Sequence, residues 1–228
     1  MKKARKWVAA LTVCAMAFTL TACGGGSDAE KDANAGGEPV VMKLATTVNE
    51  KDSFQIAAEK FKEIVEEKTD GAYQIEIYPD NKLGDEATLL ESMAAGELEL
   101  GIVTSGPFIN FSNDMGVLDM PFLFGSNEEA HKVLDGEVGQ ELLATLENSN
   151  LKGLAYAERG FRNLTNSVKP VTTVADMQGL KLRVMENEVY AKTFEALGAN
   201  ASPMAWTETL TALQNGAIEG QENPINVI

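Results

Sequence analysis

The stretch from Gly179 to Asn223 organises the sequence, and it opens with the segment Leu180-Lys181-Leu182-Arg183-Val184. Apolar and basic residues alternate in this segment, which is typical of a β-strand with one buried face. The alternation places Arg183 on the face opposite the three aliphatic side chains. A guanidinium group presents a planar fork of donors that matches a carboxylate in two parallel hydrogen bonds, whereas a lysine does not. Arg183 is therefore the first candidate for binding an organic acid.

The rest of this stretch alternates between strand and helix patterns. Glycine at Gly198 and the pair Asn215-Gly216 are expected to end the two helices, because these residues favour helix termination. We predict strands at residues 180–185, 200–204 and 217–221, and helices at residues 188–197 and 206–214. This order is a β-α-β-α-β unit, which implies a parallel sheet with right-handed crossovers.

The first half of the chain has the same order of elements. Asp52 or Ser53 can cap its first helix, which Gly71 stops, and Gly96 can end its second. We predict strands at residues 40–46, 73–78 and 98–103, and helices at residues 52–68 and 84–95. Two further helices (residues 127–134 and 137–148), a strand (151–158) and an extended segment (160–166) are predicted between the two units.

A short sequence correspondence supports a repeat. Leu90, Met93 and Gly96 precede a Leu-Glu-Leu-Gly segment in the same way that Leu210, Leu213 and Gly216 precede Ile218-Glu219-Gly220. We therefore predict an α/β protein with two similar lobes, residues 39–158 and 159–228. In open sheets of this kind, ligands bind beyond the carboxyl ends of the strands.

Composition narrows the class of partner. The chain has 228 residues, is 44% hydrophobic and 23% charged, as expected for a globular protein, and has a formal net charge of −15. A surface of this sign repels phosphate backbones, which argues against nucleic-acid binding. An anionic ligand would need a local positive site, so the arginines of the second half are informative.

The first residues resemble a bacterial lipoprotein signal. Four basic residues precede the apolar run from Trp7 to Leu20, which is too short to span a bilayer as a mature helix. The run ends in Leu20-Thr21-Ala22-Cys23, similar to a lipobox, so residues 1–23 are predicted to be a signal peptide and Cys23 the lipidated residue. An ordinary secretory signal is the alternative. Residues 24–38, rich in small and acidic residues, are predicted to be a flexible linker.

Three more residues of the second half could join Arg183 at a cleft. Arg162 could supply a second cation and Asn223 an amide donor, while the Trp206 ring could lie under a sugar-sized ligand. Each has a simpler interpretation. Arg183 could be a solvated strand residue, Arg162 could form an ion pair between the lobes, Asn223 could be a turn residue before Pro224, and Trp206 could be a core aromatic.

Catalytic interpretations find little support in the sequence. His131 is the only histidine and lies in a helix pattern beside acidic residues. We find no nucleophile-elbow motif, no phosphate-binding glycine loop and no metal-ligand spacing, so no cofactor or metal is predicted. A lipid-anchored hydrolase of acidic sugars remains an alternative because acidic residues are abundant, although nothing selects a catalytic pair.

Five motifs together resemble one family. From about Val41 onward the chain is similar to the extracytoplasmic solute receptors of tripartite ATP-independent periplasmic (TRAP) transporters, of the dicarboxylate-receptor type. The motifs, in order, are Asn81-Lys82-Leu83-Gly84-Asp85, Leu118-Asp119-Met120-Pro121-Phe122-Leu123-Phe124, Gly160-Phe161-Arg162-Asn163-Leu164-Thr165-Asn166, Gly179-Leu180-Lys181-Leu182-Arg183-Val184, and Ala212-Leu213-Gln214-Asn215-Gly216 with Gly220-Gln221-Glu222-Asn223-Pro224.

The resemblance implies a two-lobed periplasmic-binding-protein (type II) fold that closes on its ligand and delivers it to membrane permease subunits. In the family, the arginine at the position of Arg183 grips the ligand carboxylate, the one matching Arg162 assists, and the asparagine matching Asn223 bonds nearby. Trp206 stands where phenylalanine is commoner. Asp85 and Ser105 could reach the cleft from the first lobe. A ligand-sensing partner of a sensor kinase is the alternative use of such a receptor.

Two departures from the family pattern affect the expectations. Met185-Glu186-Asn187 follows Arg183 where members vary with their ligand, which leaves C4-dicarboxylates and sugar acids open. Trp206 and Glu186 favour a hydroxylated sugar acid. Family members also continue for roughly another hundred residues, so the second lobe is expected to be incomplete here and the chain is expected to be a fragment.

Overall fold

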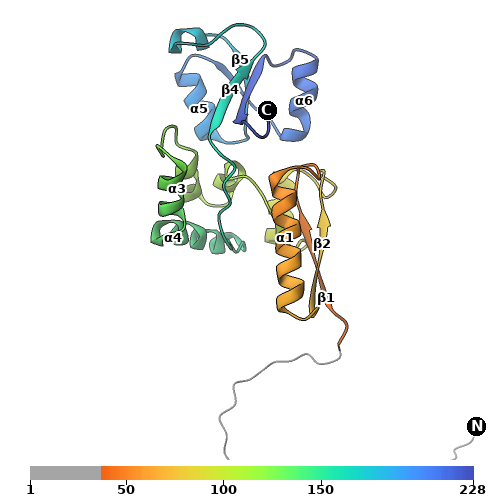
Figure 1. The fold of residues 1–228 in the computed structure, drawn as a ribbon. Helices are drawn as coiled ribbons and strands as arrows, with labels where there is room; N and C mark the ends of the chain where they lie inside the picture. The colour runs from red at the N-terminus through yellow and green to blue at the C-terminus, as the bar shows by residue number, and fades with distance from the viewer. Residues whose placement is uncertain (1–36) are drawn as a thin grey trace, which may run out of the picture. The chain divides into compact units, whose positions relative to one another are not determined.

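The computed structural model describes residues 37–228 (Figure 1). The predicted signal peptide with Cys23, and all but the last two residues of the predicted linker, lie outside the described residues. The first sheet is formed by three parallel strands in the order β2-β1-β3. Its elements are β1 (Val40–Ala45), α1 (Ser53–Lys68), β2 (Tyr73–Tyr78), α2 (Glu86–Ala95) and β3 (Leu100–Gly101).

The second sheet has four strands in the order β4-β7-β5-β6. Strands β5, β6 and β7 are parallel, and β4 pairs with β7 in the antiparallel sense. Figure 1 shows α5 and α6 beside these strands. The elements are β4 (Arg162–Asn166), β5 (Lys181–Val184), α5 (Glu188–Ala196), β6 (Asn200–Pro203), α6 (Trp206–Gln214) and β7 (Gly220–Pro224).

The predicted internal repeat is confirmed. The order β6-β5-β7 in the second sheet matches β2-β1-β3 in the first, and both sheets are parallel over these strands. The match extends to side chains. The Glu99 carboxylate accepts from the backbone N–H of Lys43 at 2.8 Å, and the Glu219 carboxylate accepts from that of Lys181 at 3.0 Å. Each glutamate ties the start of its last strand to the first strand of its unit.

Helix ends follow the capping residues of the sequence. The Asp52 side chain accepts from the backbone N–H of Phe54 and begins α1, and Asp85 begins α2. Gly96 directly follows α2 with φ 76°, and Gly216 lies one residue further from the end of α6, after Asn215, with φ 75°. A residue with a β-carbon is strained at such angles, which explains glycine at both positions.

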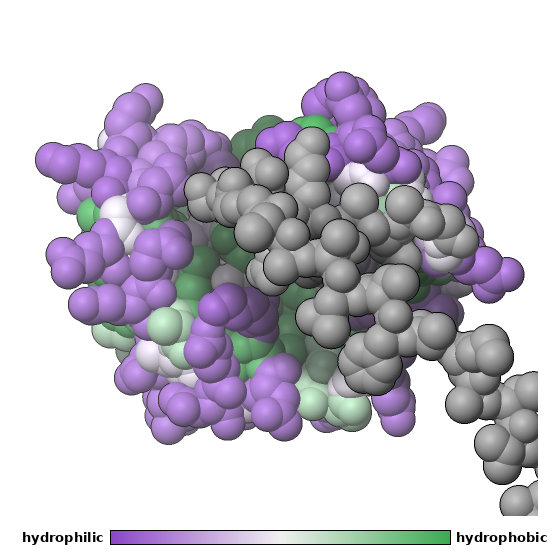
Figure 2. All heavy atoms as spheres, turned by 90° about the horizontal axis from the view of Figure 1, so that it is seen from below, coloured by the Kyte–Doolittle hydropathy of each residue, from purple (hydrophilic) through white to green (hydrophobic). Residues whose placement is uncertain are grey.

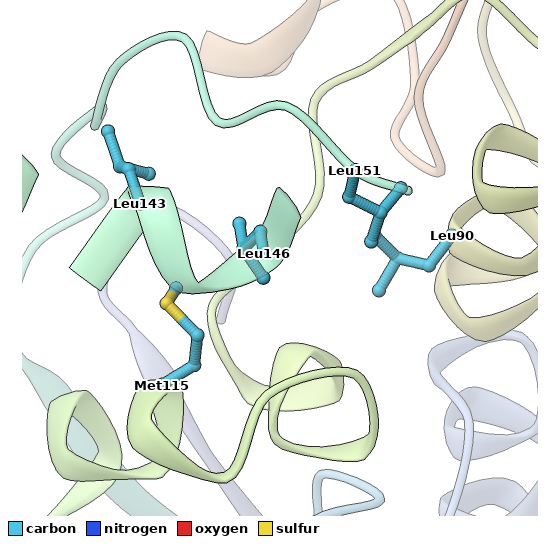
Figure 3. Close-up of a cluster of buried hydrophobic side chains, with 5 residues drawn as sticks. All are labelled: Leu90, Met115, Leu143, Leu146 and Leu151. Atoms are coloured by element: carbon cyan, nitrogen blue, oxygen red, sulfur yellow. The ribbon is translucent and has the colours of Figure 1, made fainter. Parts of the chain in front are cut away.

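The segment between the sheets contains α3 (Asn127–Leu134), α4 (Glu137–Thr145) and three short 3₁₀ helices, Gly106–Asn110, Asn113–Asp119 and Leu146–Ser149. Its core is the cluster of buried side chains in Figure 3. The cluster contains Leu90 of α2 together with Met115, Leu143, Leu146 and Leu151. Through this cluster, helix α2 of the first sheet packs against the segment that connects the two sheets in sequence.

Three predicted strands differ clearly from the structure. The strand predicted at residues 98–103 is shortened to Leu100–Gly101. Residues 151–158 form no strand among the described residues, because Leu151 packs into the cluster of Figure 3 and leaves this segment unpaired. The last strand was expected at residues 217–221, whereas β7 is Gly220–Pro224. Its start is later because Ala217 and Ile218 still complete the end of α6, donating to Asn215 Oδ1 and to the Ala212 carbonyl.

One face of the molecule can be compared by hydropathy. Figure 2 shows hydrophilic residues on the outside of the visible face and hydrophobic residues between them. None of the helices in residues 37–228 has the length and apolar character needed to cross a membrane.

Candidate functional site

A small cavity lies where the carboxyl ends of strands from both sheets meet. Thr47 follows β1, Asn81 and Asp85 follow β2, Glu186 follows β5, and Ala205 follows β6. Its lining is Thr47, Asn81, Asp85, Glu86, Pro107, Arg183, Met185, Glu186, Ala205 and Trp206. Ligands of open α/β sheets bind at such strand ends, where the strand order reverses. The cavity volume is about 20 Å³, so in this state it is large enough for about one water molecule.

Arg183 is buried in the wall of this cavity, with only 4% of its surface exposed. Its Nε donates to the Met204 carbonyl at 2.8 Å, and its guanidinium carbon lies 5.8 Å from the centre of the Trp206 ring. Among the described residues, its two terminal nitrogens make no hydrogen bond and no ion pair. Burial and then the charge of Arg162 lower the pKa of Arg183 to about 10. The interpretation as a solvated strand residue is therefore wrong.

Three other predicted residues lie at the cavity with Arg183. Trp206 is half-buried at the start of α6, and the Asp85 side chain also caps α2 by accepting from the Thr88 backbone N–H at 2.9 Å. Glu186 is exposed at the rim. Partial burial and then the charge of Asp85 raise the pKa of Glu186. The structure thus brings one unpaired cation together with acidic and aromatic groups.

Arg162 and Asn223 lie together, but outside the residues that line the cavity. Arg162 forms an ion pair with Glu222, whose side chain is 3% exposed, and donates through Nη2 to Asn223 Oδ1 at 3.0 Å. Burial by itself would lower the pKa of Arg162. The hydrogen bonds to Glu222 and the negative charge of Glu222 outweigh burial, so the pKa of Arg162 is raised. This ion pair joins neighbouring strands of one sheet, rather than the two lobes, and Asn223 is part of β7 rather than a turn.

Ser105 also lies outside the cavity lining, in a buried polar network centred on Asp119. The Asp119 carboxylate accepts from Ser105 Oγ at 2.8 Å, Asn187 Nδ2 at 2.7 Å and Tyr190 Oη at 3.2 Å. Asn187 Nδ2 also donates to the Gly106 carbonyl at 2.8 Å. Burial raises the pKa of Asp119 despite these bonds. The network fixes the segment after Glu186 against the loop that follows the first sheet.

The sequence interpretation missed several residues of this region. Glu86 lines the cavity and is held by Thr104, whose N–H and hydroxyl donate to its two carboxylate oxygens at 2.9 and 2.6 Å. Asn81 contributes an Oδ1 that is buried and has no partner in the described part of the chain. Asn81 lies in the loop before α2 and Glu86 is the first residue of α2. The available signals were their nearness to Asp85 in sequence and, for Asn81, its place in the first family motif.

Two parallel β-α-β-α-β units whose strand ends converge on a buried arginine define the architecture of a two-lobed solute-binding protein. The chain belongs to the DctP family, bacterial extracellular solute-binding protein family 7, whose model matches residues 44–228. The two-lobed α/β fold and the family that the sequence predicted are confirmed. This family consists of solute-binding receptors rather than enzymes.

Individual relatives support this assignment. The 2,3-diketo-L-gulonate-binding periplasmic protein YiaO of Escherichia coli K12 is 39% identical over 187 residues, which cover 82% of this chain and 57% of YiaO. A TRAP periplasmic solute binding protein from Polaromonas sp. JS666, bound to D-erythronate, superposes with a TM-score of 0.81 and 39% identity, covering 83% of this chain and 62% of that one.

A second solved structure gives a similar result. The sugar acid binding protein DctPAm from Advenella mimigardefordensis, in complex with galactonate, has a TM-score of 0.80 and 37% identity, covering 83% of this chain and 61% of that one. The chain thus spans a little more than half the length of the relatives that it matches.

Proposed function

We propose that the chain is the ligand-binding part of an extracytoplasmic receptor that captures an organic acid, either a sugar acid or a C4-dicarboxylate, by its carboxylate. One observation carries this proposal. Arg183 is 96% buried in a cavity wall, yet its two terminal nitrogens have no partner among residues 37–228. A buried charge without a counterion is costly, and a carboxylate would supply two charge-assisted hydrogen bonds.

The other predicted residues have supporting roles in this proposal. Trp206 contacts the flank of the ligand next to Arg183, and Asp85 and Glu186 accept hydrogen bonds from it. Arg162 and Asn223 act indirectly, because their polar groups already bond to Glu222, to Gln221 and to each other. Ser105 positions Asp119 rather than the ligand.

Ligand entry requires the cavity to open. A volume of about 20 Å³ cannot hold a sugar acid, so the walls contributed by the two sheets must separate to admit one. We propose that residues 39–158 and 159–228 move as lobes, and that a ligand touching both walls stabilises the closed form. The relatives with bound sugar acids support a ligand of this size.

Delivery and location follow from the family. We propose that the closed receptor hands its ligand to the membrane subunits of a TRAP transporter, and that a lipid on Cys23 holds it at the membrane surface behind the linker of residues 24–38. Mass spectrometry of membrane-extracted protein tests the anchor directly. Loss of residues 1–22 and a diacylglyceryl group on Cys23 are expected, whereas a cleaved chain without lipid would contradict the anchor.

Binding is tested by isothermal titration of the purified protein with D-erythronate, D-galactonate and succinate. We expect at least one acid to bind. Arg183→Lys, which keeps the charge but loses the fork, should weaken binding by up to roughly 100-fold, the loss of about one charge-assisted hydrogen bond. Arg183→Ala should abolish binding. Lys181→Met, which removes an exposed cation from the same strand, is the matched control and should bind normally. Arg183 variants that bind within a few fold of the unmodified protein would refute the carboxylate clamp.

A further inference from the structure

We propose that the cavity at Arg183 selects an acid with one carboxylate and several hydroxyl groups, and rejects a dicarboxylate. The inference rests on the proposed function, and it narrows the ligand class that the function leaves open. Its basis is the uneven distribution of charge around the cavity, where, among the described residues, one arginine lies with three carboxylates and the unpaired amide oxygen of Asn81.

Thr47, Asn81 and Trp206 offer uncharged donors at the cavity, and among the described residues its one cation is Arg183. Its terminal nitrogens are the unpaired cationic donors at the cavity, and they can hold one carboxylate. The nearby arginines are already neutralised. Arg162 is paired with Glu222, and Arg159 is paired with Asp52 at 2.6 Å. Within the described residues, a second carboxylate on the ligand would therefore find no free arginine at the cavity.

The acceptor side consists of Asn81, Asp85, Glu86 and Glu186. Asn81 Oδ1 is buried without a partner, which costs free energy unless a donor reaches it. A ligand hydroxyl can donate to this oxygen and to the three carboxylates. An ionised carboxylate has no proton to donate, so the second end of a dicarboxylate would leave these acceptors unsatisfied.

The charges at the cavity also disfavour a ligand with two carboxylates. Among residues 37–228, three carboxylates and one unpaired cation line the cavity, and the negative charges of Asp85 and Glu86 disfavour ionisation of Glu186. Glu86 is held at both oxygens by Thr104, so it cannot turn away from an incoming anion without breaking these bonds. A second ligand carboxylate would meet like charges in a partly desolvated site, and such repulsion is an effective means of specificity.

Four acids with four carbons each test separately the effect of a second carboxylate and the effect of hydroxyl groups on binding. Butyrate has one carboxylate and no hydroxyls, erythronate one carboxylate with hydroxyls, succinate two carboxylates, and tartrate two carboxylates with hydroxyls. Titration of the purified protein should give tightest binding for erythronate, at least about tenfold tighter than tartrate, since one like-charge contact at a few ångströms is worth more than about 1 kcal/mol in a partly buried site. Butyrate should bind more weakly than erythronate because it donates no hydrogen bonds to the acceptor wall.

The double variant Asp85→Asn/Glu186→Gln tests whether these two carboxylates cause the selectivity against dicarboxylates. Asparagine is also a good N-cap, so α2 should remain intact. The advantage of erythronate over tartrate should shrink by about tenfold, whereas the control Glu141→Gln/Glu195→Gln, which removes two exposed charges elsewhere, should leave it unchanged. If succinate or tartrate binds more tightly than erythronate, or if both double variants behave alike, the selectivity inference is wrong although the receptor function stands. If no acid binds at all, the receptor function itself fails.

Discussion

Arg162 and Arg183 lie in the same sheet and repel each other, yet only Arg162 has a carboxylate partner in the described part of the chain. Glu222, buried between neighbouring strands, neutralises Arg162 and leaves Arg183 as the unpaired charge at the cavity. Arg162 thus forms a structural ion pair and Arg183 is the proposed ligand-binding group, so removal of the two charges leads to opposite expectations.

Replacement of Arg183 by methionine should leave the free protein as stable as before, or more stable. The substitution removes a buried charge without a counterion, and apolar replacements of buried charges are commonly neutral or stabilising. Thermal unfolding without ligand measures this effect, with Lys181→Met as the exposed control on the same strand. A melting temperature lower by more than about 5 °C would mean that Arg183 supports the fold, since such a shift corresponds to roughly 1 kcal/mol or more.

The substitution Glu222→Gln should have the opposite effect. It leaves Arg162 largely buried without its counterion, for which we expect a loss of about 3–5 kcal/mol in the free energy of unfolding. Urea denaturation of the variant and of the unmodified protein measures this loss in the free energy of unfolding. In the matched control, Glu63→Gln breaks the exposed ion pair with Lys60 and should cost at most about 1 kcal/mol. Equal effects for the two variants would show that the buried pair has no special importance.

Removal of the carboxylate at Asp119 should loosen the contact between the loop after the first sheet and the start of α5. Asp119→Ala leaves the side-chain donors of Ser105, Asn187 and Tyr190 without their acceptor, and we expect a loss of about 3 kcal/mol, or about 1 kcal/mol for each lost bond. Urea denaturation of this variant can be compared with Asp114→Ala, in which an exposed aspartate of the same 3₁₀ helix is removed. A loss no larger than in that control would contradict a role for the network.

Asp176 should make stability depend on pH in the acid range. Hydrogen bonds from the backbone N–H of Thr172 and from Thr173 lower its pKa from the ordinary 3.8 to about 2. Because the folded pKa lies below the unfolded one, the contribution is complete above about pH 4 and is lost as the pH falls through about 2. The difference in melting temperature between the unmodified protein and Asp176→Asn should therefore shrink from pH 6 towards pH 2. A constant difference over this range would contradict the prediction.

Much of the fold could be predicted because it depends on near neighbours in sequence. The alternation around Arg183 predicted a strand, the bounds of α3 were predicted as observed, and the glycines after α2 and α6 marked their ends. Repeated helix and strand lengths also allowed the two similar units to be recognised. The strand over residues 151–158 was wrong because a strand needs a partner, and sequence periodicity does not provide one.

The candidate site was predicted only in part. Arg183, Trp206, Asp85 and Glu186 do line one cavity. The partners of Arg162 and the group of residues around Asp119 were not predicted, because they join segments separated by about 60 to 70 positions.

The sequence alone therefore determined the family, the order of elements and the arginine that lies opposite the apolar face of β5, because periodicity and motifs are local properties. Only the tertiary structure decided which of the two arginines keeps free donors and which acceptors face it. These properties depend on the strand order β4-β7-β5-β6, which places Glu222 next to Arg162, and on the meeting of loops from both sheets, which places Asn81 and Glu86 at the cavity of Arg183.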